Sequence, residues 1–307
     1  MKVLILGSNG LVGSSLSRVL AKDGYFNEIV SATRKDADLL DLSETKKLIQ
    51  ETKPNVVINA AAKVGGVLAN NSHRSEFLIE NIKININVLE SVIPFSEIKV
   101  INLGSSCIYP LNADNPIKEE SIMSGKLEPT NSPYAMAKLT AIELGDSISK
   151  QFGHQITNLM PTNLYGPNDN FSDKNSHVIP GLIQRFHKAK INNADSVEVW
   201  GSGNPKREFL YVDDLAECIM HILKNNIDNN LINIGSGHEV SIKELVDKVV
   251  ELTNYKGVVE YNSDLPDGNP KKLIDSSKIN ELGWSASTDL DVGLKNTYSW
   301  YVNNINL

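Results

Sequence analysis

Cysteine is scarce in this chain, which has only Cys107 and Cys218 among 307 residues. Two cysteines are too few for a disulfide framework and are typical of a reducing compartment, so we expect a cytoplasmic protein. Long apolar runs are also missing, because no segment reaches the roughly 20 residues of a membrane helix and the amino-terminal run is shorter than a signal sequence. These absences predict a protein that is neither embedded in a membrane nor secreted.

Basic residues are few relative to acidic ones. The chain has 30 Lys and Arg against 37 Asp and Glu, a net charge of −7, and no long run of Lys or Arg. A surface of this kind disfavours nucleic acid and anionic membranes as partners. The remaining composition, 41% hydrophobic and 22% charged, is ordinary for a globular protein that folds around its own core.

Short apolar segments alternate with longer segments of helical periodicity in the first half of the chain. This alternation is typical of βαβ units, which build a parallel sheet. The expected strands are 2–6, 29–31, 56–59, 99–103 and 156–160, and the expected helices are 11–22, 43–51, 82–92 and 134–152. The sequence therefore predicts an α/β fold with a Rossmann-type doubly wound parallel sheet.

A glycine-rich segment lies between the first expected strand and the first expected helix. Its glycines would let backbone amides approach a pyrophosphate at the positive end of the helix. A tight turn without a ligand can use glycine too, but this position in the first βαβ unit favours a dinucleotide. The predicted cofactor-binding residues here are Gly7, Ser8, Asn9, Gly10, Leu11, Val12 and Gly13.

The end of the second expected strand bears on the choice between NAD and NADP. A carboxylate there would accept hydrogen bonds from a ribose, whereas a basic side chain would meet a 2′-phosphate. The segment reads Ser31-Ala32-Thr33-Arg34, with no carboxylate directly after the strand. Arg34 therefore favours NADP(H), while a solvated loop arginine is the alternative interpretation.

The regular alternation ends near residue 161, where the chain becomes rich in Asn, Asp and Pro. Helical patterns follow at 178–190, 212–224 and 242–252, with strands expected at 231–234 and 258–261. We predict an NADP-binding Rossmann domain over residues 1–165, which 208–235 rejoins. Residues 166–207 and 236–307 are predicted to form a smaller mixed α/β substrate-binding domain.

Three residues suggest carbonyl reduction. Tyr134 and Lys138 are four residues apart, so they share one face of an expected helix, where the ammonium would favour the phenolate and adapt the phenol to acid catalysis. Ser105 follows an expected strand, at the edge where open α/β sheets bind ligands. The three together predict a Ser-Tyr-Lys reductase site.

A cysteine close to this serine suggests a second reaction. A free cysteine is more often a small buried hydrophobe, but Cys107 lies two residues beyond Ser105 and so beside a carbonyl bound there. A thiolate could remove a proton from a carbon next to that carbonyl, if an acid returns one to the opposite face. His177 is the candidate acid, although spacing alone does not select it among six histidines.

Six further stretches identify a resemblance to the GDP-L-fucose synthase family of the extended short-chain dehydrogenases/reductases. They are AAAKVGG (60–66), LGSSCIYP (103–110), LEPTN (127–131), PTNLYGP (161–167), NSHVIP (175–180) and WGSG (200–203). The resemblance implies epimerisation of GDP-4-keto-6-deoxy-D-mannose at C3 and C5 and reduction at C4 by NADPH. Cys107 would be the base, His177 the acid, and Tyr134 the proton donor in reduction.

The resemblance also implies binding residues. For the cofactor these are Thr33, Arg34, Leu103, Gly104, Ser105, Ser106, Lys138, Pro161, Thr162, Asn163, Leu164 and His177, and for the substrate they are Arg185, Trp200, Arg207, Asp267 and Lys272. Some family members have basic residues where this chain has Asn9 and Ala32, which leaves Arg34 as the main contact for a 2′-phosphate. The family further implies a homodimer formed through the helices that begin near Ile82 and Tyr134.

Two alternatives stay open at this stage. A relative that acts on another GDP-4-keto-deoxy sugar, such as one that forms GDP-L-colitose, would have the same residues. A dinucleotide-binding sensor without turnover would not need Ser105, Tyr134 and Lys138, and all three are present. No metal site is predicted.

Overall fold

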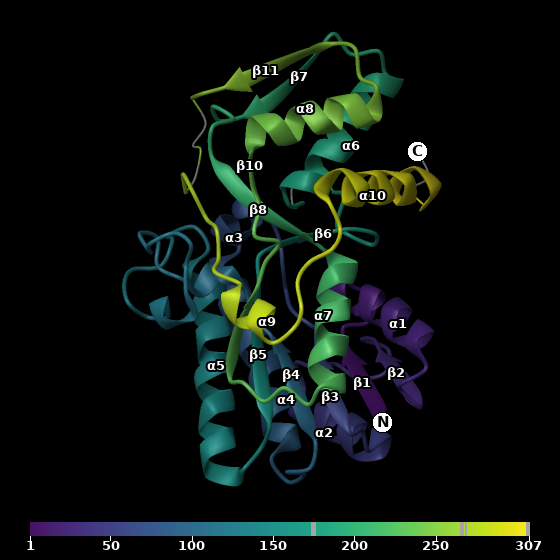
Figure 1. Ribbon diagram of the computed structural model, residues 1–307, viewed down its shortest axis with the longest axis vertical. Helices are drawn as coiled ribbons and strands as arrows, with labels where there is room; N and C mark the ends of the chain where they lie inside the picture. The colour runs from purple at the N-terminus through teal and green to yellow at the C-terminus, as the bar shows by residue number, and fades with distance from the viewer. Residues whose placement is uncertain (173–175, 265–266, 268, 305–307) are drawn as a thin grey trace.

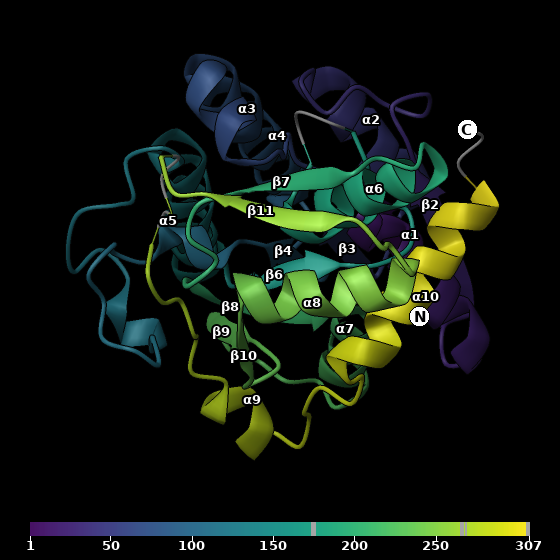
Figure 2. The ribbon, with the colours of Figure 1, turned by 90° about the horizontal axis from the view of Figure 1, so that it is seen from above.

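The fold is organised around a six-stranded parallel sheet with the strand order β2-β1-β3-β4-β5-β9. The computed structural model describes residues 1–172, 176–264, 267 and 269–304. The strands are β1 (Lys2–Leu6), β2 (Glu28–Ala32), β3 (Val56–Asn59), β4 (Lys99–Leu103), β5 (Ile156–Pro161) and β9 (Leu231–Ile234). Figures 1 and 2 show helices on both faces, which confirms the predicted doubly wound fold.

The two faces of the sheet are covered by different helices. Along β1, Val3 and Ile5 pack in the cluster that includes α1 (Leu11–Asp23) and α7 (Val212–Lys224). Leu4 and Leu6 face the opposite cluster, formed with α2 (Leu42–Thr52), α4 (Arg74–Val92) and α5 (Ser132–Phe152). Both faces are therefore buried, which explains why β1 has a continuous apolar sequence.

A second part of the molecule lies beyond the carboxyl ends of the sheet strands (Figure 1). It has a three-stranded sheet in the order β10-β8-β6 and a two-stranded sheet of β11 and β7. The bounds are β6 (Asn163–Tyr165), α6 (Val178–Ile191), β7 (Ser196–Trp200), β8 (Lys206–Tyr211), β10 (Glu239–Ser241), α8 (Ile242–Thr253), β11 (Val258–Asn262) and α10 (Leu290–Asn304). An aromatic-rich core, which includes Tyr165, Phe186 and Tyr301, holds these elements together.

Helix α4 begins at Arg74, eight residues before the start that the sequence predicts. The buried face of its first turns includes asparagines, which interrupt the apolar pattern. Asn81 bonds to the backbone N–H of Lys63 at 2.9 Å, and Asn85 accepts from the amide of Asn59 at 3.1 Å. In the part that the sequence misses, residues 74–81, the buried side chains are Phe77 and Asn81, and one apolar residue is too few to show helical periodicity.

The remaining helices are short segments that connect the larger elements. They are α3 (Val67–Ser72), α9 (Ser277–Glu281) and two single 3₁₀ turns, η1 (Ser106–Ile108) and η2 (Glu119–Ser121). Turn η1 contributes most to the site described below, because it follows β4 directly. Across the part of the chain that the structure describes, no helix has the length and apolar character needed to cross a membrane.

Candidate active site

The carboxyl end of β4 brings Ser105 and Cys107 to the sheet edge that faces the second part of the molecule. Gly104 follows the strand, and the Ser105 hydroxyl accepts a hydrogen bond from the Cys107 N–H at 3.2 Å. This bond lies at the start of turn η1 and holds Ser105 and Cys107 close together. Both residues are half-buried, whereas Ser106 between them is buried. A ligand at this edge can therefore reach Ser105 and Cys107.

Helix α5 brings Lys138 to the same strand end. Its ammonium donates to the carbonyl of Leu103, the last residue of β4, at 2.6 Å. The ammonium also lies 5.8 Å from the centre of the Tyr134 ring, one turn earlier on the helix. Burial lowers the pKa of Lys138 to about 8. The lysine thus links the tyrosine to the strand that precedes Ser105.

The Tyr134 phenol differs from the sequence-based expectation that Lys138 would lower its pKa. Burial raises the pKa of Tyr134 well above its usual value, and the charge of the neighbouring Cys107 raises it further. The ammonium is held by the Leu103 carbonyl, on the strand side of the ring. The phenol is therefore protonated near neutral pH, which is the state that a proton donor requires.

Cys107 is joined to the start of α5 by a residue that the sequence reasoning did not select. The amide nitrogen of Asn131 lies 3.5 Å from the Cys107 sulfur and donates a hydrogen bond to it. Asn131 is the residue before α5, three positions ahead of Tyr134. The available signal was the LEPTN stretch (127–131), which ends at this asparagine.

His177 lies at the amino terminus of α6, as its N-cap residue. The residue is exposed, yet the surrounding protein desolvates its ring and lowers the pKa of His177. Among the described residues, no hydrogen bond or ion pair joins its ring to Ser105 or Cys107. Asn175, in the NSHVIP stretch, lies outside the described residues.

The glycine-rich turn after β1 has the shape of a pyrophosphate cradle. A Cβ at Gly13 would lie 2.2 Å from the Gly7 carbonyl oxygen, and Gly7 itself has a φ of +79°. Only glycine fits this turn at these two positions. Gly10 has no side chain to cap α1, so the first amides of the helix, over Leu11 and Val12, remain available to an anion.

The loop after β2 is held in one conformation next to this cradle. The Ser8 N–H and hydroxyl both donate to the Ala32 carbonyl, at 3.1 and 2.9 Å. One carboxylate oxygen of Asp36 accepts from the Thr33 N–H and hydroxyl, at 2.8 Å each, and these bonds lower the pKa of Asp36. The Asp36 carboxylate is therefore hydrogen-bonded within the loop, while Arg34 is exposed.

The segment after β5 connects the parallel sheet to the second part of the molecule. Pro161 ends β5, and the next residue, Thr162, donates its N–H to Ile234 of β9 at 3.0 Å. The Thr162 hydroxyl and the Asn163 amide both donate to the Glu208 carbonyl, at 3.2 and 2.8 Å. These bonds hold Asn163, which is exposed, and Leu164, which is half-buried, next to the end of β5.

Arg185 and Trp200 come together on the second part of the molecule. The guanidinium of Arg185, on α6, lies 5.8 Å from the centre of the Trp200 ring. One of its nitrogens donates to the Glu198 carbonyl at 2.7 Å. Trp200 leaves 48% of its surface exposed, an unusual degree for tryptophan. An exposed indole beside a guanidinium suits a planar, anionic ligand.

A second pair of predicted substrate residues lies beside Trp200. The Asp267 carboxylate accepts from the Ser202 N–H and hydroxyl, at 2.6 and 2.7 Å, and these bonds lower its pKa with a smaller contribution from Arg207. Gly201 permits this approach, because a Cβ there would lie 2.4 Å from an Asp267 oxygen. Arg207 donates to the Asn269 carbonyl at 2.5 Å. Lys272 is three residues after Asn269 in the chain.

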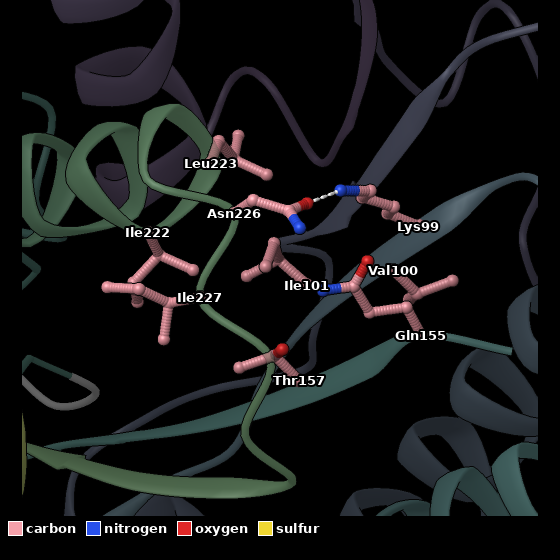
Figure 3. A pocket seen from close by; sticks show the side chains of 9 residues that line it. All are labelled: Lys99, Val100, Ile101, Gln155, Thr157, Ile222, Leu223, Asn226 and Ile227. Atoms are coloured by element: carbon pink, nitrogen blue, oxygen red, sulfur yellow. Dashed lines mark hydrogen bonds between the residues drawn. The ribbon is translucent and has the colours of Figure 1, made fainter.

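A small pocket at the other edge of the sheet is separate from this site. Its lining includes Lys99, the first residue of β4, and Gln155, the residue before β5. Ile222 and Leu223, from the end of α7, and Ile227, which follows that helix, also line it. Figure 3 shows the Lys99 ammonium bonded to the Asn226 amide oxygen across its mouth. Because Ser105 follows the opposite end of β4, this pocket does not belong to the candidate active site.

Curated relatives resemble the chain over almost its whole length. It is 45% identical to a probable GDP-L-fucose synthase 1 of Oryza sativa subsp. japonica, over 99% of this chain and 93% of the relative. It is 42% identical to GDP-L-fucose synthase of Escherichia coli K12, over 99% and 97%. A GDP-L-colitose synthase of Yersinia pseudotuberculosis is 36% identical, over 100% and 99%.

Solved structures show the same architecture. A GDP-6-OMe-4-keto-L-xylo-heptose reductase from C. jejuni has a TM-score of 0.91 at 32% identity, and covers 99% of this chain and 98% of its own. A GDP-L-fucose synthetase from Naegleria fowleri, bound to NADP, has a TM-score of 0.91 at 29% identity, over 99% and 93%. The family model described as NAD dependent epimerase/dehydratase family matches residues 3–235. With this match and the relatives above, the chain belongs to the NAD dependent epimerase/dehydratase family.

Proposed function

We propose that this protein converts GDP-4-keto-6-deoxy-D-mannose to GDP-L-fucose with NADPH. The observation that carries the proposal is the position of a thiol in a reductase site. The Asn131 amide joins the Cys107 sulfur to the start of α5, the helix that bears Tyr134 and Lys138. The relatives named GDP-L-fucose synthase support the choice of substrate.

Epimerisation needs a base and an acid beside a ketone, and Cys107 and His177 are the proposed pair. The C4 carbonyl acidifies the protons on C3 and C5, and Ser105 would donate its hydroxyl to the enolate oxygen. Cys107 would remove each proton as a thiolate, and His177 would return one to the opposite face of the same carbon. The lowered pKa of His177 makes its imidazolium form a readier proton donor.

Reduction follows at the same carbonyl. Tyr134 would protonate the C4 oxygen, for which its raised pKa keeps the phenol protonated. Lys138 would bind the nicotinamide ribose, and its ammonium would keep the ring of Tyr134 close to the end of β4, next to Ser105. The glycine-rich turn after β1 would hold NADPH, which would supply the hydride for C4. The proton from Tyr134 and this hydride balance the change from ketone to alcohol.

The nucleotide of the substrate would lie on the second part of the molecule. Arg185 and Arg207 carry the positive charge that a pyrophosphate needs, and Lys272 adds an ammonium nearby in the chain. Trp200 offers an exposed indole for the base. Residues 1–165 with 208–235 would thus bind the cofactor, and 166–207 with 236–307 the substrate. The division differs from the sheets at two places, because β6 and β8 pair with β10 in the sheet of the second part.

Arg34 supports NADPH as the preferred cofactor, because it is an exposed basic residue in the turn that Thr33 and Asp36 close. We expect Arg34→Ala to lower the preference for NADPH over NADH about tenfold, through loss of one charge-assisted bond to the 2′-phosphate. The measurement is kcat/KM with each cofactor. Lys22→Ala, on the exposed end of α1, is the matched control, and an unchanged preference in Arg34→Ala would contradict the assignment.

The direct test incubates the purified protein with GDP-4-keto-6-deoxy-D-mannose and either NADPH or NADH. Loss of absorbance at 340 nm with formation of GDP-L-fucose, identified by NMR, supports the proposal. The GDP-L-colitose synthase relative makes a 3,6-dideoxy ketosugar the second candidate substrate. A kcat/KM that is higher for GDP-4-keto-3,6-dideoxy-D-mannose would select that function instead.

A homodimer and a cytoplasmic location complete the proposal. Helices α4 and α5 pack side by side, and each leaves a large apolar side chain exposed, Ile79 by 51% and Met136 by 47%. A second copy of the chain would cover both. The location is supported by the two cysteines, which are both free thiols.

We expect Met136→Asp to shift the protein from dimer to monomer, because a carboxylate there would be buried without a partner. Size-exclusion chromatography with light scattering measures the mass. Met123→Asp, at a side chain that is 72% exposed on a loop, is the control and should stay dimeric. A Met136→Asp protein that keeps the dimer mass would place the interface elsewhere.

A further inference from the structure

Asn131, the residue before α5, uses its side chain for a contact outside that helix. A residue at this position usually caps the helix by accepting from its first amides. The Asn131 side chain does not cap α5, and its amide nitrogen instead donates to the Cys107 sulfur at 3.5 Å. The side chain is therefore committed to the thiol, although the helix start offers it a favourable alternative.

The segment around Asn131 is held rigidly by its neighbours. The Glu128 carboxylate accepts from the N–H groups of Thr130 and Asn131, at 3.1 Å each, and from the Thr130 hydroxyl at 2.5 Å. The Arg74 guanidinium, from the start of α4, donates to the Pro129 carbonyl at 2.8 Å. These contacts fix the backbone that aims the Asn131 amide at Cys107.

The carboxamide oxygen of Asn131 is an unpaired buried acceptor among the described residues. Buried acceptors without a partner are rare in folded proteins and often mark functional positions. A thiol proton on Cys107 is a donor that could reach this oxygen after a half-turn of the amide. One carboxamide thus offers a donor to the thiolate and an acceptor to the thiol.

We propose that Asn131 is a positioning residue for the Cys107 base, which it hydrogen-bonds in the thiolate state and again after the sulfur has taken a proton. The inference rests on the proposed epimerisation, because only proton transfer uses Cys107 as a base. The carboxamide stabilises the negative sulfur, and the positive end of the 21-residue helix α5 adds to this effect. Its removal should impair proton transfer and leave hydride transfer intact.

Asn131→Asp is the sharpest probe, because it keeps the shape and one acceptor but replaces the donor by a negative charge. We expect it to slow alkylation of Cys107 by iodoacetamide about tenfold at fixed pH, since the thiolate loses a hydrogen bond and gains a repulsion. Peptide mass spectrometry identifies the alkylated residue, and Cys218, which is fully buried, serves as an internal reference. Asn131→Ala should give a smaller effect than Asn131→Asp.

The same variants are then tested in the two half-reactions. Exchange of the C3 and C5 protons with deuterium should fall by the same factor as alkylation, while reduction of the pre-epimerised ketone stays within about twofold of wild type. Retained reduction also shows that the variants fold. Asn192→Asp, on the exposed end of α6, is the matched control and should behave as wild type in each assay.

Two results would overturn the role of Asn131. One is a wild-type alkylation rate in Asn131→Asp, and the other is an equal loss of exchange and reduction, which a purely structural role would produce. Alkylation requires no substrate. A protein that turns over no GDP-keto sugar, yet shows slower Cys107 alkylation in Asn131→Asp, would therefore refute the proposed function and support the contact with the thiol.

Discussion

Replacement of Tyr134 by Phe should abolish reduction while proton exchange continues. The change removes only the phenol oxygen, and the ring keeps its place beside the Lys138 ammonium. Loss of a general acid typically costs a factor of about 10² to 10⁴ in rate, and we expect reduction to fall within this range. Absorbance at 340 nm measures reduction, and deuterium incorporation at C3 and C5, followed by mass spectrometry, measures exchange.

The control for this variant is Tyr25→Phe, which removes a phenol that is 42% exposed on the far side of the cofactor-binding part. It should leave both rates unchanged. Equal losses of exchange and reduction in Tyr134→Phe would mean that the phenol supports binding or folding in general. Reduction at the wild-type rate would require another proton donor to the C4 oxygen.

Replacement of Cys107 by Ser should have the opposite effect. A serine hydroxyl is close in size to the thiol and can still accept from the Asn131 amide, so the site keeps its shape. The hydroxyl ionises far less readily than a thiol, and we expect deuterium exchange to fall by about 10² to 10⁴. Reduction of GDP-4-keto-6-deoxy-L-galactose, the pre-epimerised ketone, should continue near the wild-type rate.

Cys218→Ala is the matched control, because Cys218 is the second cysteine and lies in the core on α7, on the face of the sheet that α1 and α7 cover. It should exchange protons as the wild type does. If Cys107→Ser exchanged at the wild-type rate, the thiol would not be the base. Together with Tyr134→Phe, the variant separates the two half-reactions that one site is proposed to perform.

Much of the cofactor-binding part could be predicted from the sequence because its signals are local. Strands such as β1 and β4 are buried on both faces, and their residues are mostly apolar. The glycine-rich turn and the four-residue spacing of Tyr134 and Lys138 act within one turn or one helix face. These features need no knowledge of distant residues, and the structure has each element where the pattern indicates it.

The strands of the second part were harder to predict. β6, β8 and β10 form one sheet, but β6 and β10 have three residues each and lie some 75 residues apart in the chain. Short strands carry little periodicity, and their pairing depends on which segments meet in space. The start of α4 was missed for a related reason, because the buried Asn81 interrupts the apolar pattern and its hydrogen-bond partner, Lys63, is distant in the sequence.

The sequence by itself determined the sheet, the glycine-rich turn, and the presence of Ser105, Tyr134 and Lys138 with the nearby Cys107. Each of these depends on the spacing of residues that are close in the chain. Only the tertiary structure decided what those groups touch. The contact of Asn131 with Cys107 spans 24 residues, and that of Ser202 with Asp267 spans 65. Both exist because α5 packs against turn η1 and because β11 pairs with β7, and no local pattern encodes either of these long-range contacts.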